Sequence, residues 1–349
     1  MHLLEKTMKI FKRIIIGLIV VLVIIGIALG VYVYQGKKAL DSIDNNQTSV
    51  SQKINEGKPI SVLLLGADTG ADGRVDRGNS DTMMIVTLNP KTNSSVMYSI
   101  PRDTMAEMVG AGKNKKDVQK INAAYNIGKA KMAKNTVGEL LGINVDYSVA
   151  INMAALKKTV DFVDGVTVTT PIKVSFDGIT IPKGTHHLNG KQALTYVRMR
   201  YEDPRGDYGR QLRQQQVLKA VVKKLQQPQY LVKLPSLITT LGPDINTDLT
   251  DKQMETFPVK YHGAGKKMTS KQLQGQSAWI NGSSYQILSN STMQRASDKL
   301  RDNLGLKQQK LNNTETRLNK LNAEFFNNPD STDYDTHGLD TTYYTDNTY

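Results

Sequence analysis

The chain has 349 residues and a formal net charge of +13, and 39% of its residues are hydrophobic, enough to build one large or two modest folded domains. It has no cysteine, which excludes disulfides, thiol nucleophiles, zinc–thiolate sites and iron–sulfur clusters. The five histidines, at positions 2, 186, 187, 262 and 337, show no metal-ligand spacing. Any bound metal is therefore expected to use oxygen ligands.

The first strong signal along the chain is an uncharged apolar run from Ile14 to Tyr34. It has the roughly 20 residues that an α-helix needs to cross a bilayer. A cleaved signal peptide is the alternative, but the run is too long for one and no A-x-A cleavage site follows. Four basic residues precede the run and two follow it closely, a bias that places residues 1–13 in the cytoplasm. We expect a single-pass protein of the cell membrane, with its catalytic domain outside the cell.

The next segments alternate between strand and helix patterns. Residues 35–58 are polar and predict an extracellular stalk. Residues 60–68, ISVLLLGAD, predict a strand that is buried on both faces. Further strands are predicted in 81–90, 94–103 and 165–176, and helices in 135–142, 152–165 and 211–226. This alternation predicts an α/β (α+β) fold with a central mixed β-sheet flanked by helices.

The C-terminal third carries weaker signals. Thr250 and Gln253 form a T-x-x-Q capping box that predicts the start of a helix. We assign 59–306 to one domain, although residues after about 229 show no readable motif, and 307–326 to a polar helical extension. Residues 327–349 are acidic, lack lysine and arginine and have no apolar period, so we expect a disordered tail.

Arginines concentrate in residues 196–216, YVRMRYEDPRGDYGRQLRQQQ. The alternation predicts that Arg198 and Arg200 lie on one face of an extended segment. After a turn, four positions share one stripe of the next helix: Arg210, Arg213, Gln214 and Val217. Guanidinium groups beside a helix N-terminus suit phosphate oxygens.

Two other interpretations of these arginines remain. They can be solvated or paired with the acidic residues among them, although their place above an apolar stripe argues against full solvation. They can also bind nucleic acid, but acidic residues interrupt the cluster and the domain is expected outside the cell. We therefore expect no nucleic-acid partner.

Acidic residues are expected at neighbouring strand ends. Asp68 follows the first predicted strand, Asp81 begins the second, and Arg102 and Asp103 follow the third. Two converging carboxylates beside arginines suit Mg²⁺, which takes one or two protein carboxylates with phosphates and waters. The alternative is that each aspartate only caps a turn. No Walker loop, EF-hand, G-x-S-x-G elbow or Ser–His pair is present, so direct attack by an acceptor hydroxyl is favoured over a covalent enzyme intermediate.

The motifs LLLGAD, SDTMMIVTLNP, SIPRD, KINAAY, LNGKQALTYVRMR and DPRGDYGRQLRQQQ, in this order, resemble the LytR-CpsA-Psr family of Gram-positive envelope proteins over residues 59–226. The resemblance implies a membrane-anchored α/β domain that binds a polyprenyl-pyrophosphate glycan in an apolar cleft. It implies transfer of the phosphoglycan, such as teichoic acid or capsule, to peptidoglycan. Aliphatic residues in 140–163 and 216–225 suit the lipid-binding wall, but they serve equally well as ordinary core.

The resemblance also implies roles for individual residues. Asp68 and Asp81 would hold Mg²⁺ or another divalent cation such as Mn²⁺. The pyrophosphate would be gripped by Arg102, Arg198, Arg200 and Arg210, with further contacts from Arg77, Lys120, Arg205, Arg213 and Gln214. Asp103 would either orient Arg102 or act as a base. Many family members carry arginine two residues before the second metal aspartate, where this chain has Asn79, so the role of Arg77 is open.

Two other functions use the same features. A polyprenyl-pyrophosphate phosphatase would need the same arginines and metal, with water as the acceptor. A non-catalytic envelope regulator or transcriptional attenuator is the other alternative. About a dozen residues precede the predicted span, too few for a DNA-binding domain, which opposes a direct role in transcription.

Overall fold

The computed structural model describes residues 52–67, 78–110, 117–225 and, with short gaps between 226 and 262, 227–339. The predicted membrane span, Asp68 and Arg77 lie outside these residues. Among the described helices, none combines the length and the apolar character needed to cross a membrane.

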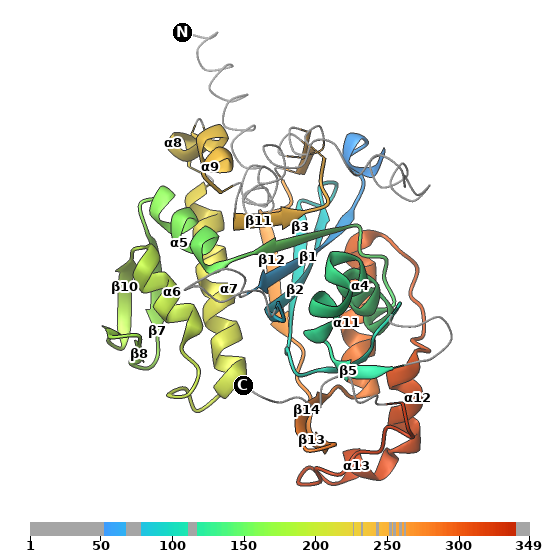
Figure 1. Ribbon diagram of the computed structural model, residues 1–349. Coiled ribbons are helices and arrows are strands. Elements are labelled where there is room, and N and C mark those ends of the chain that lie inside the picture. The colour runs from blue at the N-terminus through green and yellow to red at the C-terminus, as the bar shows by residue number, and fades with distance from the viewer. Residues whose placement is uncertain are drawn as a thin grey trace.

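A six-stranded mixed sheet forms the centre of the domain (Figure 1). Its strands, in spatial order, are β11 (Ile245–Thr247), β6 (Tyr147–Ile151), β1 (Ile60–Ala67), β2 (Ser80–Asn89), β3 (Ser94–Ile100) and β12 (Lys267–Gln272). β1 pairs antiparallel with β2 and parallel with β6, and β12 runs parallel to β3. The strands expected in 60–68, 81–90 and 94–103 are confirmed, and β12 joins the C-terminal third to the same domain.

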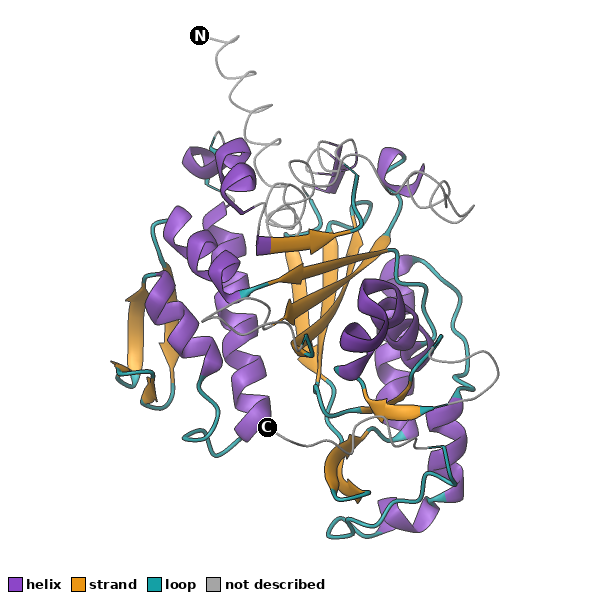
Figure 2. Cartoon of the chain, in the orientation of Figure 1, coloured by secondary structure: helices purple, strands orange, loops and turns teal. Residues whose placement is uncertain are grey.

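Helices cover both faces of this sheet (Figure 2). One layer contains α5 (Met153–Phe162), α6 (Gly190–Arg198) and α7 (Gly206–Leu225), and the other contains α4 (Ala123–Leu141) and α11 (Asn290–Leu304). Val62 and Leu64 of β1 pack in the core on the α5–α7 side, whereas Leu63 and Leu65 pack on the α4 and α11 side. Because both faces are buried, β1 is apolar at every position except Ser61 rather than alternating. The predicted α/β fold and the helices expected in 135–142, 152–165 and 211–226 are confirmed.

Smaller elements surround the core. They are β4 (Met105–Glu107), β5 (Val118–Lys120), β7 (Val166–Thr170), β8 (Val174–Phe176), β9 (Ile179–Ile181), β10 (Gly184–Leu188), α8 (Pro228–Leu231), α9 (Leu234–Leu241), β13 (Gln276–Ile280), β14 (Ser283–Ile287), α12 (Thr314–Leu321) and α13 (Ala323–Asn327). The strands expected in 165–176 form, but in two-stranded sheets beside α6 and α7 rather than in the central sheet. The capping box is also present, since Thr250 N donates to Gln253 Oε1 at 2.7 Å.

The extended segment expected around Arg198 is wrong. Helix α6 begins with a capping box formed by Asn189 and Gln192 and continues to Arg198. Tyr196 is fully buried on this helix, in the core beneath α7. The alternation of arginine and apolar residues covers too few positions to distinguish a strand from the last turn of a helix.

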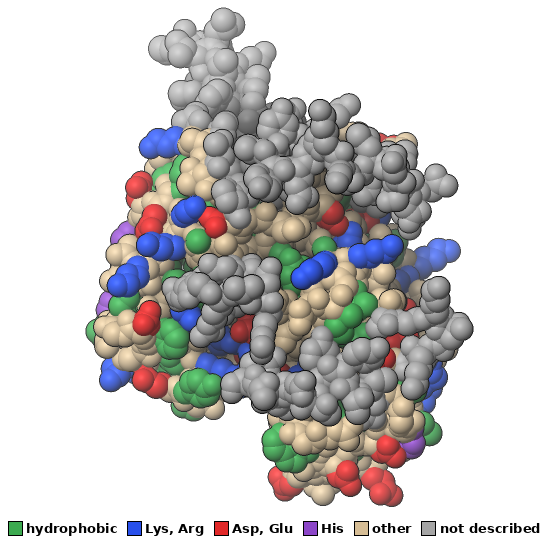
Figure 3. Space-filling view, viewed as in Figure 1, with side chains coloured by type: hydrophobic (Ala, Val, Ile, Leu, Met, Phe, Trp, Pro, Cys, Tyr) green, Lys and Arg blue, Asp and Glu red, His purple; other side chains and the backbone are tan. Residues whose placement is uncertain are grey.

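Both ends of the ordered domain extend further than predicted. Residues 52–55 are helical and Ile54 is fully buried, so the fold begins before residue 59. At the other end, Tyr334 packs edge-on against Phe325 with ring centroids 5.2 Å apart, and its hydroxyl donates to Asn319 Oδ1 at 2.7 Å. The prediction of disorder is therefore wrong for 327–339, because Tyr334 and backbone bonds such as those from Trp279 N to Thr332 O and from Val118 N to Leu339 O anchor this polar segment. Residues 340–349 lie outside the described part of the chain. Acidic side chains gather on the surface over α13 (Figure 3).

One buried carboxyl predicts an unusual pH dependence. Glu315 of α12 is buried, its Oε1 accepts from Glu107 N, and burial raises its pKa to about 7, with Glu107 and Glu139 adding to the rise. A raised carboxyl pKa gives stability that is complete below the unfolded value of about 4.5 and is lost as pH rises towards 7. We expect Glu315→Gln to be more stable than wild type at pH 7 by up to about 3 kcal/mol, and equally stable near pH 4. Urea unfolding at both pH values checks this, and an equal difference at both would contradict it.

Candidate active site

A cavity of about 430 Å³ lies between the sheet and helices α5, α6 and α7. Its walls are mostly apolar, with Leu64, Met84 and Val149 from the sheet and Leu156, Val217 and Val221 from the helices. Thr82, Asn152 and Thr159 add polar groups, and six further polar side chains line it: Asp81, Arg102, Arg198, Arg200, Arg210 and Gln214. All six are site residues expected from the sequence. The apolar residues of 140–163 and 216–225 do supply part of the wall, as well as part of the core.

The start of β2 and the end of β3 bring Asp81 and Arg102 together. The two strands are antiparallel, and Met83 pairs with Ile100. Arg102 Nη1 donates to Asp81 Oδ1 at 2.6 Å. Burial alone would lower the pKa of Arg102, but the charges of Asp81 and Asp103 outweigh it and raise that pKa. Arg102 therefore stays fully charged inside the site.

The first turns of α7 are hydrogen-bonded to the start of β2, where Asp81 lies. Arg210 Nη2 donates to the backbone oxygen of Asp81 at 3.2 Å and forms an ion pair with Asp207 at 2.5 Å. Gln214 Nε2 donates to Thr82 Oγ1 at 2.8 Å. These bonds hold the N-terminal part of α7 against β2, so that two distant segments of the chain share one polar site.

Arg198 and Arg200 differ from the other two cavity arginines. Neither forms an ion pair with any carboxylate of the described residues, and each lies near an aromatic ring instead. The guanidinium carbon of Arg198 is 4.9 Å from the Phe176 ring centroid, and that of Arg200 is 5.7 Å from the Tyr201 ring centroid. Two positive charges at the polar part of an apolar cavity are suited to an anion with an attached apolar chain.

Asp103 and Lys120 lie behind this site and do not line the cavity. Asp103 Oδ2 is 3.6 Å from Arg102 Nε, and its Oδ1 is 3.7 Å from Lys120 Nζ. Lys120 also lies 5.4 Å from the centre of the Tyr285 ring. Of the two roles left open for Asp103, this geometry favours orienting Arg102. Lys120 lies beside Asp103 and does not line the cavity, so the substrate contact expected for it stays a prediction.

Two further residues with predicted substrate contacts, Arg213 and Arg205, lie outside the cavity lining. Arg213 is buried, with 3% of its side chain exposed, and it bonds to Asp203 and to two backbone oxygens. Arg205 lies outside the cavity, and its Nε and Nη2 both donate to Asp203 at 2.9 Å. The spacing placed Arg213 correctly on the helix. It could not show that Asp203, a carboxylate in the loop before α7, is buried beneath that helix.

A divalent cation fits the described donor set only in part. Asp81 offers a carboxylate with 43% of its side chain exposed at the cavity, and its Oδ2 has no partner among the described residues. Ala67, which precedes Asp68, pairs with Ser80, which precedes Asp81. No group of three or more acidic or histidine side chains that can hold a metal occurs in the part of the chain that the structure describes. One carboxylate beside a phosphate site is a donor set that Mg²⁺ accepts when substrate phosphates and water complete its shell.

Sequence reasoning missed the aromatic neighbours of Arg198 and Arg200. Phe176 of β8 and Tyr201 of the loop after α6 both line the cavity, and Tyr201 is 90% exposed. Tyr201 stands next to Arg200 in the chain, so an aromatic residue within the arginine motif was the available signal. Phe176 gave none, because its approach to Arg198 depends on how the small β8–β9 sheet packs on α6.

The LytR_cpsA_psr family model matches residues 29–302, which is most of the chain. This chain belongs to the LytR_cpsA_psr family. It is 37% identical to the polyisoprenyl-teichoic acid–peptidoglycan teichoic acid transferase TagU of Enterococcus faecalis, over 87% of this chain and all of that protein. It is also 37% identical to biofilm regulatory protein A of Streptococcus mutans, over 88% of this chain and 81% of that protein. Among solved structures, protein gbs0355 of Streptococcus agalactiae is 36% identical, with a TM-score of 0.69, and the match covers 78% of this chain and 97% of that one.

Proposed function

We propose that this protein transfers a phosphate-linked glycopolymer from a polyprenyl-pyrophosphate carrier to peptidoglycan. The observation that carries the proposal is the apolar cavity with two arginines, Arg198 and Arg200, that have no carboxylate partner among the described residues. The polyprenyl chain would occupy the apolar part and the pyrophosphate would lie against the arginines. The family and the TagU relative, named as a teichoic acid transferase, support this substrate class.

The proposed reaction is a direct phosphoryl-group transfer. A peptidoglycan hydroxyl attacks the phosphorus that carries the glycan, and the bond from that phosphorus to the bridging oxygen breaks. Polyprenyl phosphate leaves with the bonding electron pair, and the hydroxyl proton passes to a base or to solvent. Arg198 and Arg200 stabilise the negative charge that builds up on the phosphate oxygens, and Arg102 and Arg210 extend the same positive site.

We further propose that Mg²⁺, or another divalent cation such as Mn²⁺, assists this reaction. Asp81 would hold the ion, with Asp68 as the expected second ligand. When bound, the cation would neutralise phosphate charge and polarise the phosphorus under attack. Asp81 also orients Arg102, so the residue would serve both the cation and the arginine site.

Replacing Asp81 with asparagine tests the cation proposal. We expect Asp81→Asn to lower kcat by about 100-fold or more and to raise the Mg²⁺ concentration needed for half-maximal rate. A Mg²⁺ titration of initial rates measures both quantities. Asp335→Asn, at an exposed carboxylate near the C-terminus, is the matched control. Full activity of the wild type in EDTA, which removes divalent cations, would contradict the cation proposal and would leave the transfer proposal unaffected.

The transfer proposal itself is tested with a donor that carries a labelled glycan. The full-length protein in detergent is incubated with this donor and purified peptidoglycan sacculi. We expect label to become covalently attached to the sacculi and to depend on the enzyme. Label that stays soluble as free glycan phosphate would instead identify a polyprenyl-pyrophosphate phosphatase, and unchanged donor would favour an envelope regulator.

The cellular setting and the polymer are also proposals. The apolar run from Ile14 to Tyr34 would anchor the chain in the cell membrane, with a cytoplasmic N-terminus and an extracellular catalytic domain. This topology would put the site on the side of the membrane where peptidoglycan is assembled. Teichoic acid is the polymer we favour, because the TagU relative is named for it, and capsular polysaccharide is the alternative.

A further inference from the structure

Arg198 and Arg200 lie where α6 ends and the short loop to α7 begins, and this loop forms few hydrogen bonds of its own. Arg198 is the last residue of α6, and Arg200 lies in the loop before α7. Next to Arg200, Tyr201 is 90% exposed. The loop's own backbone bonds include Asp203 N to Arg200 O at 3.3 Å and Gly206 N to Asp203 O at 2.8 Å. Contacts from outside this loop are therefore needed to fix the direction of the two guanidinium groups.

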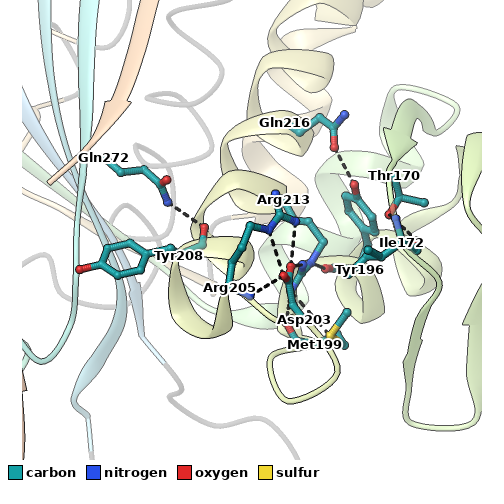
Figure 4. A network of polar contacts seen from close by, with 10 residues as sticks. All are labelled: Thr170, Ile172, Tyr196, Met199, Asp203, Arg205, Tyr208, Arg213, Gln216 and Gln272. Carbon is teal, nitrogen blue, oxygen red and sulfur yellow. Dashed lines mark hydrogen bonds and ion pairs between the residues drawn. The ribbon is translucent and has the colours of Figure 1, made fainter. Parts of the chain in front are cut away.

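The buried side chain of Arg213 contacts the backbone on both sides of Arg198 (Figure 4). Its Nε donates to Tyr196 O at 2.8 Å, two residues before Arg198. Its Nη2 donates to Met199 O, the residue between Arg198 and Arg200. Its Nη1 donates to Asp203, on the far side of Arg200. The planar guanidinium of Arg213 thus binds three points of the chain that lie on either side of Arg198 and Arg200.

Asp203 completes this network. Its side chain is fully buried and accepts from Arg205 N at 3.0 Å, from Arg205 Nε and Nη2, and from Arg213 Nη1. Burial alone would raise the pKa of Asp203, but the hydrogen bonds from Arg205 and Arg213 outweigh it and lower that pKa to about 2. A Cβ at Gly209 would lie 2.0 Å from Asp203 Oδ2, so α7 approaches the carboxylate as closely as a glycine allows.

We propose that Arg213 is a positioning residue: with Asp203 it fixes the backbone around Arg198 and Arg200 so that both guanidinium groups face the anion site. This inference rests on the proposed function in one respect, which is that the anion is taken to be a pyrophosphate. Arg213 itself touches no substrate, because it lies outside the cavity and its described bonds are all internal. Lysine cannot replace it, since one ammonium group cannot donate to these three acceptors in the geometry of a planar fork.

The test is a double-mutant cycle on ligand binding, which needs no turnover. Farnesyl pyrophosphate is titrated into the full-length protein in detergent and its affinity is measured by calorimetry. We expect Arg213→Lys to weaken binding by about 10-fold in the wild-type background, and by about 3-fold or less in an Arg200→Ala background. The smaller effect follows because only Arg198 is then left to be misplaced. An undiminished 10-fold effect in the Arg200→Ala background would overturn the proposal.

Arg301→Lys is the matched control. Arg301 also donates to backbone oxygens, those of Gly142 and Lys307, but it lies outside the cavity. We expect it to change farnesyl pyrophosphate affinity by less than about 2-fold. If Arg213→Lys does not fold, Asp203→Asn replaces it, because it loosens the same loop while keeping the size of the side chain. If the wild type transfers label normally but the double-mutant cycle shows no coupling between Arg213 and Arg200, the positioning role of Arg213 is refuted and the proposed function stands. If the cycle shows clear coupling but the wild type transfers no label, the proposed function is refuted and the positioning role stands.

Discussion

Replacing Arg200 with alanine is expected to lower kcat/KM for glycopolymer transfer by about 100-fold or more, and Arg198→Ala is expected to do the same. Each guanidinium lines the cavity without a carboxylate partner among the described residues, so its charge is available to the pyrophosphate. Removing one preorganised donor from a site of developing negative charge typically costs about 100- to 1,000-fold in rate. Initial rates of label transfer to sacculi, measured over a range of donor concentrations, give kcat and KM separately.

Lysine variants and a distant arginine provide the controls for this prediction. Arg198→Lys and Arg200→Lys keep the charge but lose the forked donor geometry, so we expect intermediate rates. Arg295→Ala removes an arginine of α11 outside the cavity and is expected to retain full activity. Activity of Arg200→Ala within about 3-fold of wild type would show that the arginine does not contact the reacting phosphate.

Replacing Asp203 with alanine is expected to cost about 3–5 kcal/mol in the free energy of unfolding. The substitution leaves the buried guanidinium of Arg213 without its counter-charge, and an unpaired buried charge is among the most destabilising changes known. Urea unfolding followed by circular dichroism measures the loss. The double variant Asp203→Leu/Arg213→Met should recover part of it, because it removes the unpaired buried charge although the backbone oxygens of Tyr196 and Met199 lose their donor.

The same ion network predicts a pH dependence. The folded pKa of Asp203, about 2, lies below the ordinary value of 3.8, so its ionised form stabilises the folded state. This stability is complete above about pH 5 and is lost as the pH falls through 4 towards 2. Asp203→Asn should flatten that part of the unfolding profile. A loss of less than about 1 kcal/mol for Asp203→Ala at pH 7 would contradict the role of the network.

Much of the fold and of the site could be predicted from the sequence because their signals are local. The run of apolar residues in β1 reports burial on both faces, and the stripe of Val217, Val221 and Leu225 reports the buried side of α7. Six predicted site residues meet in one cavity because their motifs lie at the ends of β2 and β3, at the end of α6 and in the first turns of α7. What failed depended on tertiary contacts. The burial of Arg213 on Asp203 and the anchoring of the tail by Tyr334 leave no local pattern.

The central claim is that a hydroxyl of peptidoglycan, and not water, attacks the phosphorus that carries the glycan. The most direct measurement is mass spectrometry of the products after reaction in ¹⁸O-labelled water with donor, peptidoglycan oligomers and Mg²⁺. The account predicts phosphodiester-linked glycan on peptidoglycan together with polyprenyl phosphate, with no ¹⁸O in either product. Free glycan phosphate containing one ¹⁸O atom as the main product would show that water is the acceptor and would contradict the account.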